Sequence, residues 1–194
     1  MNDEESGNNQ GLKEANAMAE RKVICYIAQS LDGYIADPEE TLDWLLDVEM
    51  DGDAGYQQFI ETVDTILLGR RTYEWVVSQE SGEFPYVDQR SYVFTSHPKE
   101  DEGQISFTSE EPASIVRKLK QQPGGTIWPV GGSLLLESLL QEDLVDEFII
   151  SIAPVTLGNG IPLFQKAQRQ FEFTLKSVGQ DGQIAQLHYT RRRK

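Results

Sequence analysis

Two segments place glycines, arginines and hydroxyl groups where an apolar run gives way to a helical pattern. Residues 126–130 lead into Gly131-Gly132-Ser133, and residues 66–68 lead into Gly69-Arg70-Arg71-Thr72. Glycine lets a backbone approach a phosphate closely, and a helix start supplies free N–H groups and the positive end of the dipole. The residue types therefore favour a phosphorylated cofactor, although any tight turn can also require the two glycines.

The adjacent arginines Arg70 and Arg71 stand out in an acidic chain. A cation at a helix N-terminus opposes the dipole, so an anion is expected nearby. The 2′-phosphate of NADP is a natural candidate, and a surface ion pair with neighbouring carboxylates is the alternative. A third segment ends an apolar run with Thr95 and Ser96. Hydroxyls at a strand end fit ligand binding in an open α/β sheet, but also a simple capping turn.

Several other chemistries lack their motifs. No G-x-G-x-x-G follows an apolar run, and neither G-x-x-x-x-G-K-[ST] nor G-x-S-x-G occurs; Gly158-Asn159-Gly160 is followed by Ile161-Pro162 and fits none of them. With one cysteine and two distant histidines, we expect no metal site. The single thiol, Cys25, lies in an apolar run and is expected in the core.

Composition limits the partners. The chain has 194 residues, a formal net charge of −15 and a pI near 4.5, so it is expected to avoid nucleic acid and anionic membranes. The basic run 191–194 is short and terminal. Residues 1–20 are polar without an apolar core, which indicates a flexible extension rather than a secretory signal, and a cytoplasmic protein. Residues 21–194 are expected to form one domain.

Hydrophobic periodicity supplies the elements that would position these groups. Strands and helices alternate, which predicts an α/β protein with a mixed, mostly parallel sheet covered by helices on both faces. A C-terminal antiparallel hairpin around Gln180-Asp181-Gly182 completes it. The predicted strands are 23–29, 65–68, 92–95, 104–108, 126–130, 148–153, 170–178 and 183–189, and the predicted helices are 54–63, 70–77, 113–120 and 133–140.

Five segments in order carry a resemblance to a known family. They are 30–36 (SLDGYIA), 68–73 (LGRRTY), 130–133 (VGGS), 144–147 (LVDE) and 153–164 (APVTLGNGIPLF). Together they resemble the dihydrofolate reductase-like proteins, and within these the C-terminal reductase domain of riboflavin biosynthesis, over residues 21–190. The last segment points to the riboflavin branch rather than to dihydrofolate reductase itself.

The resemblance implies a three-layer dihydrofolate reductase-like fold, a homodimer and an NADPH cofactor across the carboxyl ends of the strands. The implied reaction is hydride transfer to a C=N or C=O group of a pyrimidine- or pterin-type substrate, as in 5-amino-6-(5-phosphoribosylamino)uracil reductase. A cis Gly131–Gly132 bond is also implied. By position, the cofactor-binding residues would be Ala28 and Ile35 at the nicotinamide, Gly69, Arg70, Arg71 and Thr72 at the adenosine 2′-phosphate and pyrophosphate, Thr95 and Ser96 at the adenine ribose, and Gly131, Gly132 and Ser133 at the pyrophosphate. Val130 and Leu134, next to them, are also expected to bind the cofactor.

The substrate side is less determined. Asp32 and Asp53 are the candidate catalytic acids. Asp32 follows the first predicted strand, and Asp53 falls near the position of the pterin-binding acid of dihydrofolate reductases. Asp53 fits a helix N-cap better, and Asp32 equally fits a plain turn. Ser30 and Trp44 are candidate substrate contacts, although Trp44 also fits a core.

Two other functions remain open. They are a dihydrofolate reductase and an inactive NADP-binding sensor. A phosphorylated sugar substrate predicts a basic pocket, and dihydrofolate predicts an apolar groove. The chain has no H-x-E with a P-C-x-x-C partner, the pattern of zinc deaminases, so a separate deaminase would have to supply the riboflavin-type substrate.

Overall fold

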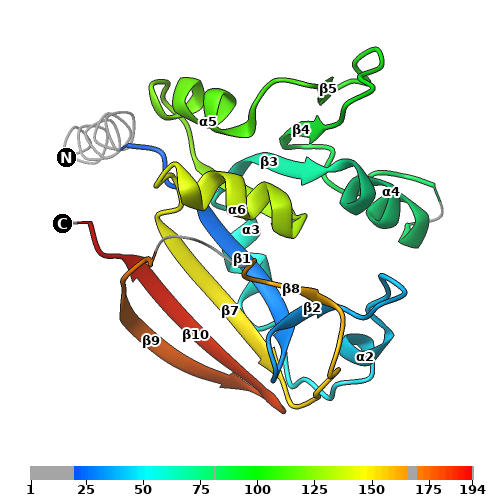
Figure 1. The fold of residues 1–194 in the computed structure, drawn as a ribbon, viewed down its shortest axis with the longest axis vertical. Helices are drawn as coiled ribbons and strands as arrows, with labels where there is room; N and C mark the ends of the chain where they lie inside the picture. Colours follow the sequence, from blue (N-terminus) through cyan, green and yellow to red (C-terminus); the bar gives the residue numbers. More distant parts are fainter. Residues whose placement is uncertain (1–19, 81, 166–169, 194) are drawn as a thin grey trace, which may run out of the picture.

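The computed structural model describes residues 20–80, 82–165 and 170–193. The expected N-terminal extension, residues 1–20, lies outside the described residues except for Glu20. The chain folds into an α/β structure in which strands and helices alternate before a C-terminal hairpin (Figure 1). This is the predicted fold class.

Eight of the strands form two four-stranded sheets that meet edge to edge. One has the order β5-β4-β3-β6 and is parallel throughout; the other has the order β1-β7-β10-β9, with β10 antiparallel to both neighbours. A parallel bridge between Val23 and Ile127 joins them. These strands are β1 (Ile24–Ser30), β3 (Val63–Gly69), β4 (Arg90–Phe94), β5 (Ile105–Thr108), β6 (Thr126–Gly131), β7 (Glu147–Ala153), β9 (Phe173–Asp181) and β10 (Ile184–Arg191).

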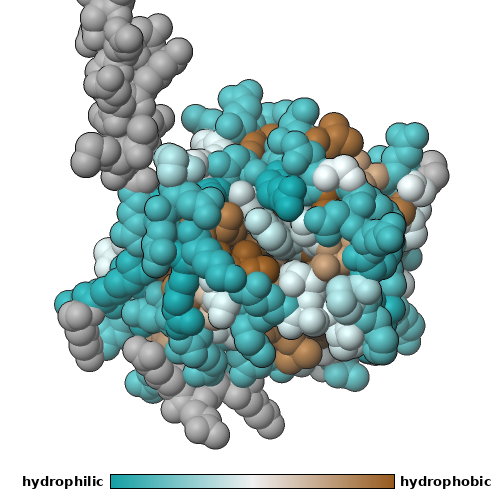
Figure 2. Space-filling model, turned by 90° about the horizontal axis from the view of Figure 1, so that it is seen from above, coloured by the Kyte–Doolittle hydropathy of each residue, from teal (hydrophilic) through white to brown (hydrophobic). Residues whose placement is uncertain are grey.

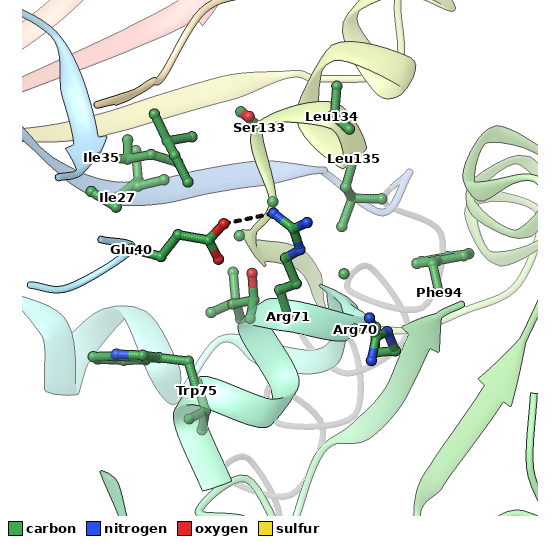
Figure 3. Close-up of a pocket in the computed structure, with 18 of the residues that line it drawn as sticks. Ile27, Ile35, Glu40, Arg70, Arg71, Trp75, Phe94, Ser133, Leu134 and Leu135 are labelled. Carbon is green, nitrogen blue, oxygen red and sulfur yellow. Dashed lines mark hydrogen bonds and ion pairs between the residues drawn. The ribbon is translucent and has the colours of Figure 1, made fainter. Parts of the chain in front are cut away.

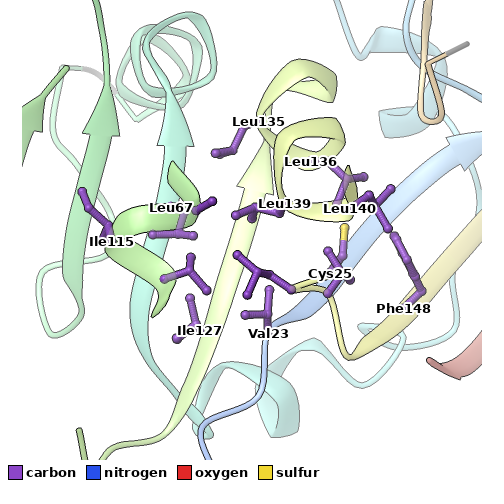
Figure 4. Close-up of a cluster of buried hydrophobic side chains, with 14 of the residues drawn as sticks. Val23, Cys25, Leu67, Ile115, Ile127, Leu135, Leu136, Leu139, Leu140 and Phe148 are labelled. Atoms are coloured by element: carbon purple, nitrogen blue, oxygen red, sulfur yellow. The ribbon is translucent and has the colours of Figure 1, made fainter. Parts of the chain in front are cut away.

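Helices cover both faces of these sheets because the central strands are apolar on both sides. Leu67 of β3 packs in the cluster beneath α5 (Pro112–Lys120) and α6 (Ser133–Gln141), shown in Figure 4. Its neighbours Ile66 and Leu68 point to the opposite face, towards α3 (Tyr56–Ile60) and α4 (Arg70–Gln79). All three side chains are fully buried. This continuous apolar strand is typical of a parallel sheet between two helical layers.

The thiol of Cys25 lies in the core below α6, as predicted (Figure 4). Burial raises its pKa to about 12, so the thiolate that a nucleophile requires does not form near neutral pH.

Three short elements were not predicted, and one helix was predicted too long. The unpredicted elements are β2 (Tyr34–Ala36), α2 (Asp43–Leu46) and β8 (Ile161–Pro162), with β2 and β8 pairing antiparallel. The helix expected at 54–63 is only α3, Tyr56–Ile60. Ala54 and Gly55 have positive φ angles of 51° and 79°, so the helix cannot begin before Tyr56. At the other end, Val63 already belongs to β3.

The face in Figure 2 is mostly hydrophilic, with apolar side chains near its centre and in smaller groups towards its edges. Among the described residues, no helix is long and apolar enough to cross a membrane.

Candidate cofactor and substrate site

A cavity of about 790 Å³ opens where the strands β3, β4 and β6 end. It lies against the first turns of α4 and α6, and β2 and the loop before α2 close another side (Figure 3). The structure brings every residue that was expected to bind the cofactor to this one cavity. The lining includes Ala28, Ile35, Gly69, Arg70, Arg71, Thr72, Thr95, Ser96, Val130, Gly131, Gly132, Ser133 and Leu134.

Two helices begin at the cavity without side-chain caps. The residues before α4 and α6 are Gly69 and Gly132, neither of which can cap the first N–H groups with a side chain. These N–H groups and the positive ends of both helix dipoles are therefore available to an anion in the cavity. The phosphates of a dinucleotide are anions, which helix N-termini of this kind bind.

The glycine pair at the end of β6 is required by its surroundings. A Cβ on Gly131 would lie 3.0 Å from Cγ2 and 3.2 Å from Oγ1 of Thr72. Gly132 has a φ of 98°, which L side chains rarely adopt. The implied cis bond between these glycines is not present, because no cis peptide occurs in the described residues. The positive φ of Gly132 makes the turn with a trans bond, which a non-proline residue favours by about 2.5–4 kcal/mol.

The two arginines at the start of α4 both have carboxylate partners. Arg70 pairs with Glu74 at 2.9 Å, one helical turn later, and Arg71 pairs with Glu40 at 2.6 Å. Figure 3 shows Arg71 pointing to Glu40, with Arg70 on the side of Phe94. Both arginines thus form the surface ion pairs that were the alternative to phosphate binding. Both remain more than half exposed, which leaves their other guanidinium donors accessible to a ligand.

Five of the aromatic side chains that line the cavity contact one another or stand beside this group, and we call the part of the cavity that they line the aromatic chamber. Trp128 is its centre: its ring lies 6.0 Å from Tyr56 and 5.6 Å from Tyr86, both edge to face. Burial raises the pKa values of the phenols of Tyr56 and Tyr86, so both stay protonated. The chamber consists of Tyr26, Tyr56, Trp75, Tyr86 and Trp128.

The aromatic chamber was not predicted. Its members come from β1, α3, α4, β6 and the loop before β4, so no sequence spacing connects them. Tyr26 offered the one available signal, since it lies two residues before Ala28 on the same strand and thus on the same side.

Asp32 and Ser30 stabilise a loop and do not line the cavity. The Asp32 carboxylate accepts hydrogen bonds from Ser30 Oγ at 2.7 Å and from the backbone N–H groups of Leu157 and Gly158 at 3.0 and 2.7 Å. The Ser30 hydroxyl also accepts the N–H of Tyr34. These contacts, led by Ser30, lower the pKa of Asp32 to about 2. Asp32 therefore stabilises a turn, which was the alternative interpretation. The positions of Asp32 and Ser30 do not support the catalytic role expected of Asp32 or the substrate contact expected of Ser30.

Asp53 and Trp44 also lie outside the cavity lining. The Asp53 carboxylate accepts the backbone N–H groups of Gly55 and Gln57, each at 2.9 Å. The N-cap residue of α3 is Gly55, so Asp53 stabilises the first turn from two residues before the N-cap, close to the predicted capping role. Trp44 is half-buried in α2, and its Nε1 has no hydrogen-bond partner among the described residues; Leu42 and Leu45 beside it line the cavity instead.

Comparison with known proteins places the fold and the site in a family. The model of the RibD C-terminal domain matches residues 21–187. The chain belongs to this family. It is 45% identical to the uncharacterized protein YwjB of Bacillus subtilis (strain 168) over 173 residues, which cover 89% of this chain and 99% of YwjB.

Solved structures agree with this assignment. A putative riboflavin biosynthesis protein from Shewanella sp. PV-4 superposes with a TM-score of 0.79 and 29% identity, covering 89% of this chain and 99% of that one. Dihydrofolate reductase from Enterococcus faecalis, complexed with NADP(H), has the same fold, with a TM-score of 0.57, 19% identity and coverage of 89% and 97%. The resemblance to a dihydrofolate reductase-like fold of the RibD C-terminal type is therefore confirmed.

The residues of this RibD C-terminal domain fit a dinucleotide cofactor. A Cβ on Gly131 would crowd Thr72, and Gly132 has a φ angle that other residues rarely adopt. Both positions therefore favour glycine, which leaves the backbone before the uncapped helix α6 accessible from the cavity. The arginines supply positive charge at the other uncapped helix, and Ile35 with Ile27 forms an apolar wall across the cavity (Figure 3). Phosphates and a nicotinamide ring require these two kinds of surface in one pocket.

Proposed function

We propose that this RibD C-terminal domain protein is an NADPH-dependent reductase that transfers a hydride to a C=N or C=O group of a pyrimidine- or pterin-type ring. One observation carries the proposal: the uncapped helix starts, the arginines and the aromatic chamber line the same cavity. The NADP(H) bound to the dihydrofolate reductase of similar fold supports the choice of cofactor. A Thermotoga maritima protein of similar fold is described as a diaminohydroxyphosphoribosylaminopyrimidine deaminase and 5-amino-6-(5-phosphoribosylamino)uracil reductase, which supports this class of reaction.

Two groups of residues would bind the cofactor, one at its phosphates and one at its nicotinamide. The N–H groups at the starts of α4 and α6 bind the pyrophosphate, and Arg70 and Arg71 bind the 2′-phosphate, which NADH lacks. Thr95 and Ser96 lie at the end of β4, where they can donate to ribose oxygens. Ala28, Ile27 and Ile35 would hold the nicotinamide by apolar contact.

Bound NADPH supplies the hydride, and the protein supplies alignment and a dry site. Ile27, Ile35 and Trp128 remove water from the reacting atoms because they present apolar surface to the cavity. The substrate must also receive a proton. Besides the two arginines, the ionisable groups that line the cavity in the described part of the chain are Glu40, which pairs with Arg71, and the phenols of the aromatic chamber, so these groups and water are the candidate proton sources.

Deuterium transfer tests the proposed function on a mixture of candidate substrates. NADPH deuterated at the transferable C4 position is incubated with the protein and a bacterial metabolite extract, and products are followed by mass spectrometry. We expect a metabolite that gains one deuterium and one proton only with active protein. A control variant, Arg70→Ala/Arg71→Ala, should label much less at low NADPH. Binding of NADPH without any labelled product would instead support the sensor function.

Two further properties are proposed together with the reductase function. A reducing, cytoplasmic location suits a chain whose thiol is buried and unpaired. A homodimer suits the exposed edge strand β9, where Leu175 and Val178 are 49% and 64% exposed.

A further inference from the structure

The tip of the C-terminal hairpin is bonded to a loop that lies far away in the sequence. β9 ends at Asp181, beside the segment that joins α2 to α3 (Figure 1). The Asp181 carboxylate accepts the backbone N–H groups of Asp51, Gly52 and Ala54 at 2.7, 2.7 and 2.6 Å. These hydrogen bonds, led by that of Ala54, hold the pKa of Asp181 below its usual range, so the carboxylate is charged at neutral pH. One side chain thus fixes three peptide groups of residues 51–54, which we call the 51–54 loop.

The hairpin tip and the loop are also in close backbone contact. A Cβ on Gly182, next to Asp181, would lie 2.5 Å from the carbonyl oxygen of Glu49, and a Cβ on Gly52 would lie 3.1 Å from Asp181 Oδ2. The N–H of Gln183 donates to the same Glu49 oxygen at 3.0 Å. The two glycines therefore allow an approach that side chains at these positions would prevent.

Ala54 is the residue of the 51–54 loop that receives hydrogen bonds from three strands. Its φ of 51° is uncommon for a residue other than glycine, so its conformation must be held by its surroundings. Its N–H donates to Asp181 of β9, and its carbonyl oxygen accepts Tyr26 of β1 at 2.9 Å and Gln186 of β10 at 2.7 Å. Backbone strain that is held in this way is found mostly near functional sites.

The 51–54 loop continues directly into the wall of the aromatic chamber. Gly55 is the N-cap of α3 and Tyr56 is its first residue, so the loop determines where this helix begins. The Tyr26 hydroxyl donates to the carbonyl oxygen of Ala54, and the rings of Tyr26 and Tyr56 lie 6.0 Å apart, edge to face. The loop therefore holds two of the chamber's side chains, one at its hydroxyl and one at its helix start.

Asp181 can act on the chamber without acting on the cofactor's phosphates. Neither Asp181 nor the 51–54 loop lines the cavity, whereas Tyr26 and Tyr56 do. The residues proposed to bind the phosphates stand on other elements, at the starts of α4 and α6. The aromatic chamber is the part of the cavity that this arrangement leaves for the substrate.

We propose that Asp181 is a positioning residue for the aromatic chamber: its carboxylate holds the 51–54 loop in its strained conformation and thereby fixes Tyr26 and Tyr56 beside the substrate. This inference rests on the proposed reductase function, in which the chamber receives the substrate. Hydride transfer requires the donor and acceptor carbons in close and aligned contact, so a wall that shifts by a fraction of an ångström lowers the rate.

Fluorine NMR of the full chain labelled with 3-fluorotyrosine tests the placement. The seven tyrosines give seven signals, and Tyr26→Phe and Tyr56→Phe assign two of them. In Asp181→Ala we expect these two signals to shift or broaden, and the signal of Tyr92, on β4 of the other sheet, to stay. Asp181→Asn should shift them less, because its amide oxygen can still accept the two N–H groups that are bonded to Oδ1.

Cofactor binding and hydride transfer are measured on the same variants. Asp181→Ala should bind NADPH within twofold of the unaltered protein, followed by nicotinamide fluorescence. With saturating NADPH deuterated at C4 and the bacterial metabolite extract, it should form labelled product at least tenfold more slowly. Asp181→Asn should fall between the two.

Asp143→Ala is the matched control, because it removes a carboxylate that holds the other end of the same hairpin. Asp143 lies between α6 and β7 and pairs with Arg191, the last residue of β10, at 2.7 Å. This variant should lower the melting temperature and leave the signals of Tyr26 and Tyr56, NADPH binding and the labelling rate unchanged. A role of Asp181 in stability alone would give the same pattern.

Three results would overturn the inference. They are unmoved Tyr26 and Tyr56 signals in Asp181→Ala, an equal shift of both signals in Asp143→Ala, and a loss of NADPH affinity in Asp181→Ala as large as its loss of labelling rate. If the unaltered protein bound NADPH and formed no labelled product, the proposed function would fail. The fluorine signals would then still decide whether Asp181 places the two tyrosines.

Discussion

Arg71 and Glu40 form an ion pair at the mouth of the cavity, and a cofactor phosphate would compete for the same guanidinium. Glu40 lies in a loop closed by two hydrogen bonds between Asp37 and Thr41, so its position is held by the chain around it. Replacing the carboxylate should free Arg71 for the phosphate.

We therefore predict that Glu40→Gln tightens NADPH binding about 1.4- to fivefold and leaves NADH binding unchanged. The size follows from the worth of an exposed ion pair, about 0.2–1 kcal/mol. Isothermal titration calorimetry measures both affinities. Glu142→Gln, which removes the partner of Arg117 outside the cavity, is the control and should change neither. Weaker NADPH binding in Glu40→Gln would contradict the competition.

Asp32 should behave as a structural acid. Its folded pKa, about 2, lies below the value near 3.9 of an unfolded chain, so its contacts stabilise the fold above pH 4 and are lost as the pH falls towards 2. We predict that Asp32→Asn lowers the melting temperature at pH 7 and that its difference from the unaltered protein shrinks between pH 4 and pH 2.5. Asp88→Asn is the control. A pH-independent difference would contradict the assigned contacts.

Residue types and the resemblance pointed to the residues that line the cavity at the two helix starts, and not to the aromatic chamber. Gly131, Gly132, Arg70 and Arg71 all line that cavity, although a tight turn and surface ion pairs also use these residue types. An aspartate after a strand is ambiguous, because loop hydrogen bonds require the same carboxylate as catalysis does. The aromatic chamber was invisible because aromatic side chains are also the usual material of a core.

At the scale of elements, the junction between β6 and α6 lines the cavity with the backbone of Gly131 and Gly132. Gly132→Ala should strain the backbone at φ 98° by about 1–2 kcal/mol and place a methyl group near the helix start. We predict a lower melting temperature and at least tenfold weaker NADPH binding, measured by thermal unfolding and nicotinamide fluorescence.

Gly103→Ala is the matched control for this variant. Gly103 also has a positive φ, 59°, with nothing within 4 Å of an added Cβ, and it lies outside the cavity. It should lose stability without losing NADPH. If both variants bound NADPH equally well, the junction would not be a cofactor site.

Long elements could be predicted and short ones could not. β3, α5 and β10 span enough residues for a period to appear, and their positions were predicted within two residues at most ends. β8 contains only Ile161–Pro162 and α2 only four residues, so neither shows a period. Their positions depend on long-range contacts, such as the pairing of Tyr34 with Pro162.

On the scale of the whole molecule, the buried carboxylate of Glu147 interacts with side chains of β9, of β10 and of the segment before β1. Glu147, at the start of β7, is 4% exposed and accepts hydrogen bonds from Lys22 at 2.7 Å and from Lys176 of β9 at 3.4 Å. His188 of β10 lies 2.6 Å away. Burial raises the pKa of Glu147, but the hydrogen bonds of Lys22 and His188 outweigh burial and lower it on balance.

We predict that Glu147→Gln lowers the free energy of unfolding by about 1.5–3 kcal/mol at pH 7, the range for hydrogen bonds to charged groups. Because the folded pKa is lowered, this stabilisation is present above the unfolded value near 4.3 and is lost as the pH falls through the folded pKa. Urea unfolding at pH 7 and pH 3.5 measures it, with Glu100→Gln as an exposed control. An equal loss at both pH values would contradict the charge-based account.

The most direct test of the central claim, that one cavity at the strand ends binds NADPH, is a titration of the protein with NADPH and with NADH. We predict NADPH binding at least tenfold tighter than NADH binding. Arg70→Ala should remove most of that preference and Arg117→Ala, on α5, should leave it intact. Equal affinity for the two cofactors, or no binding of either, would contradict the account.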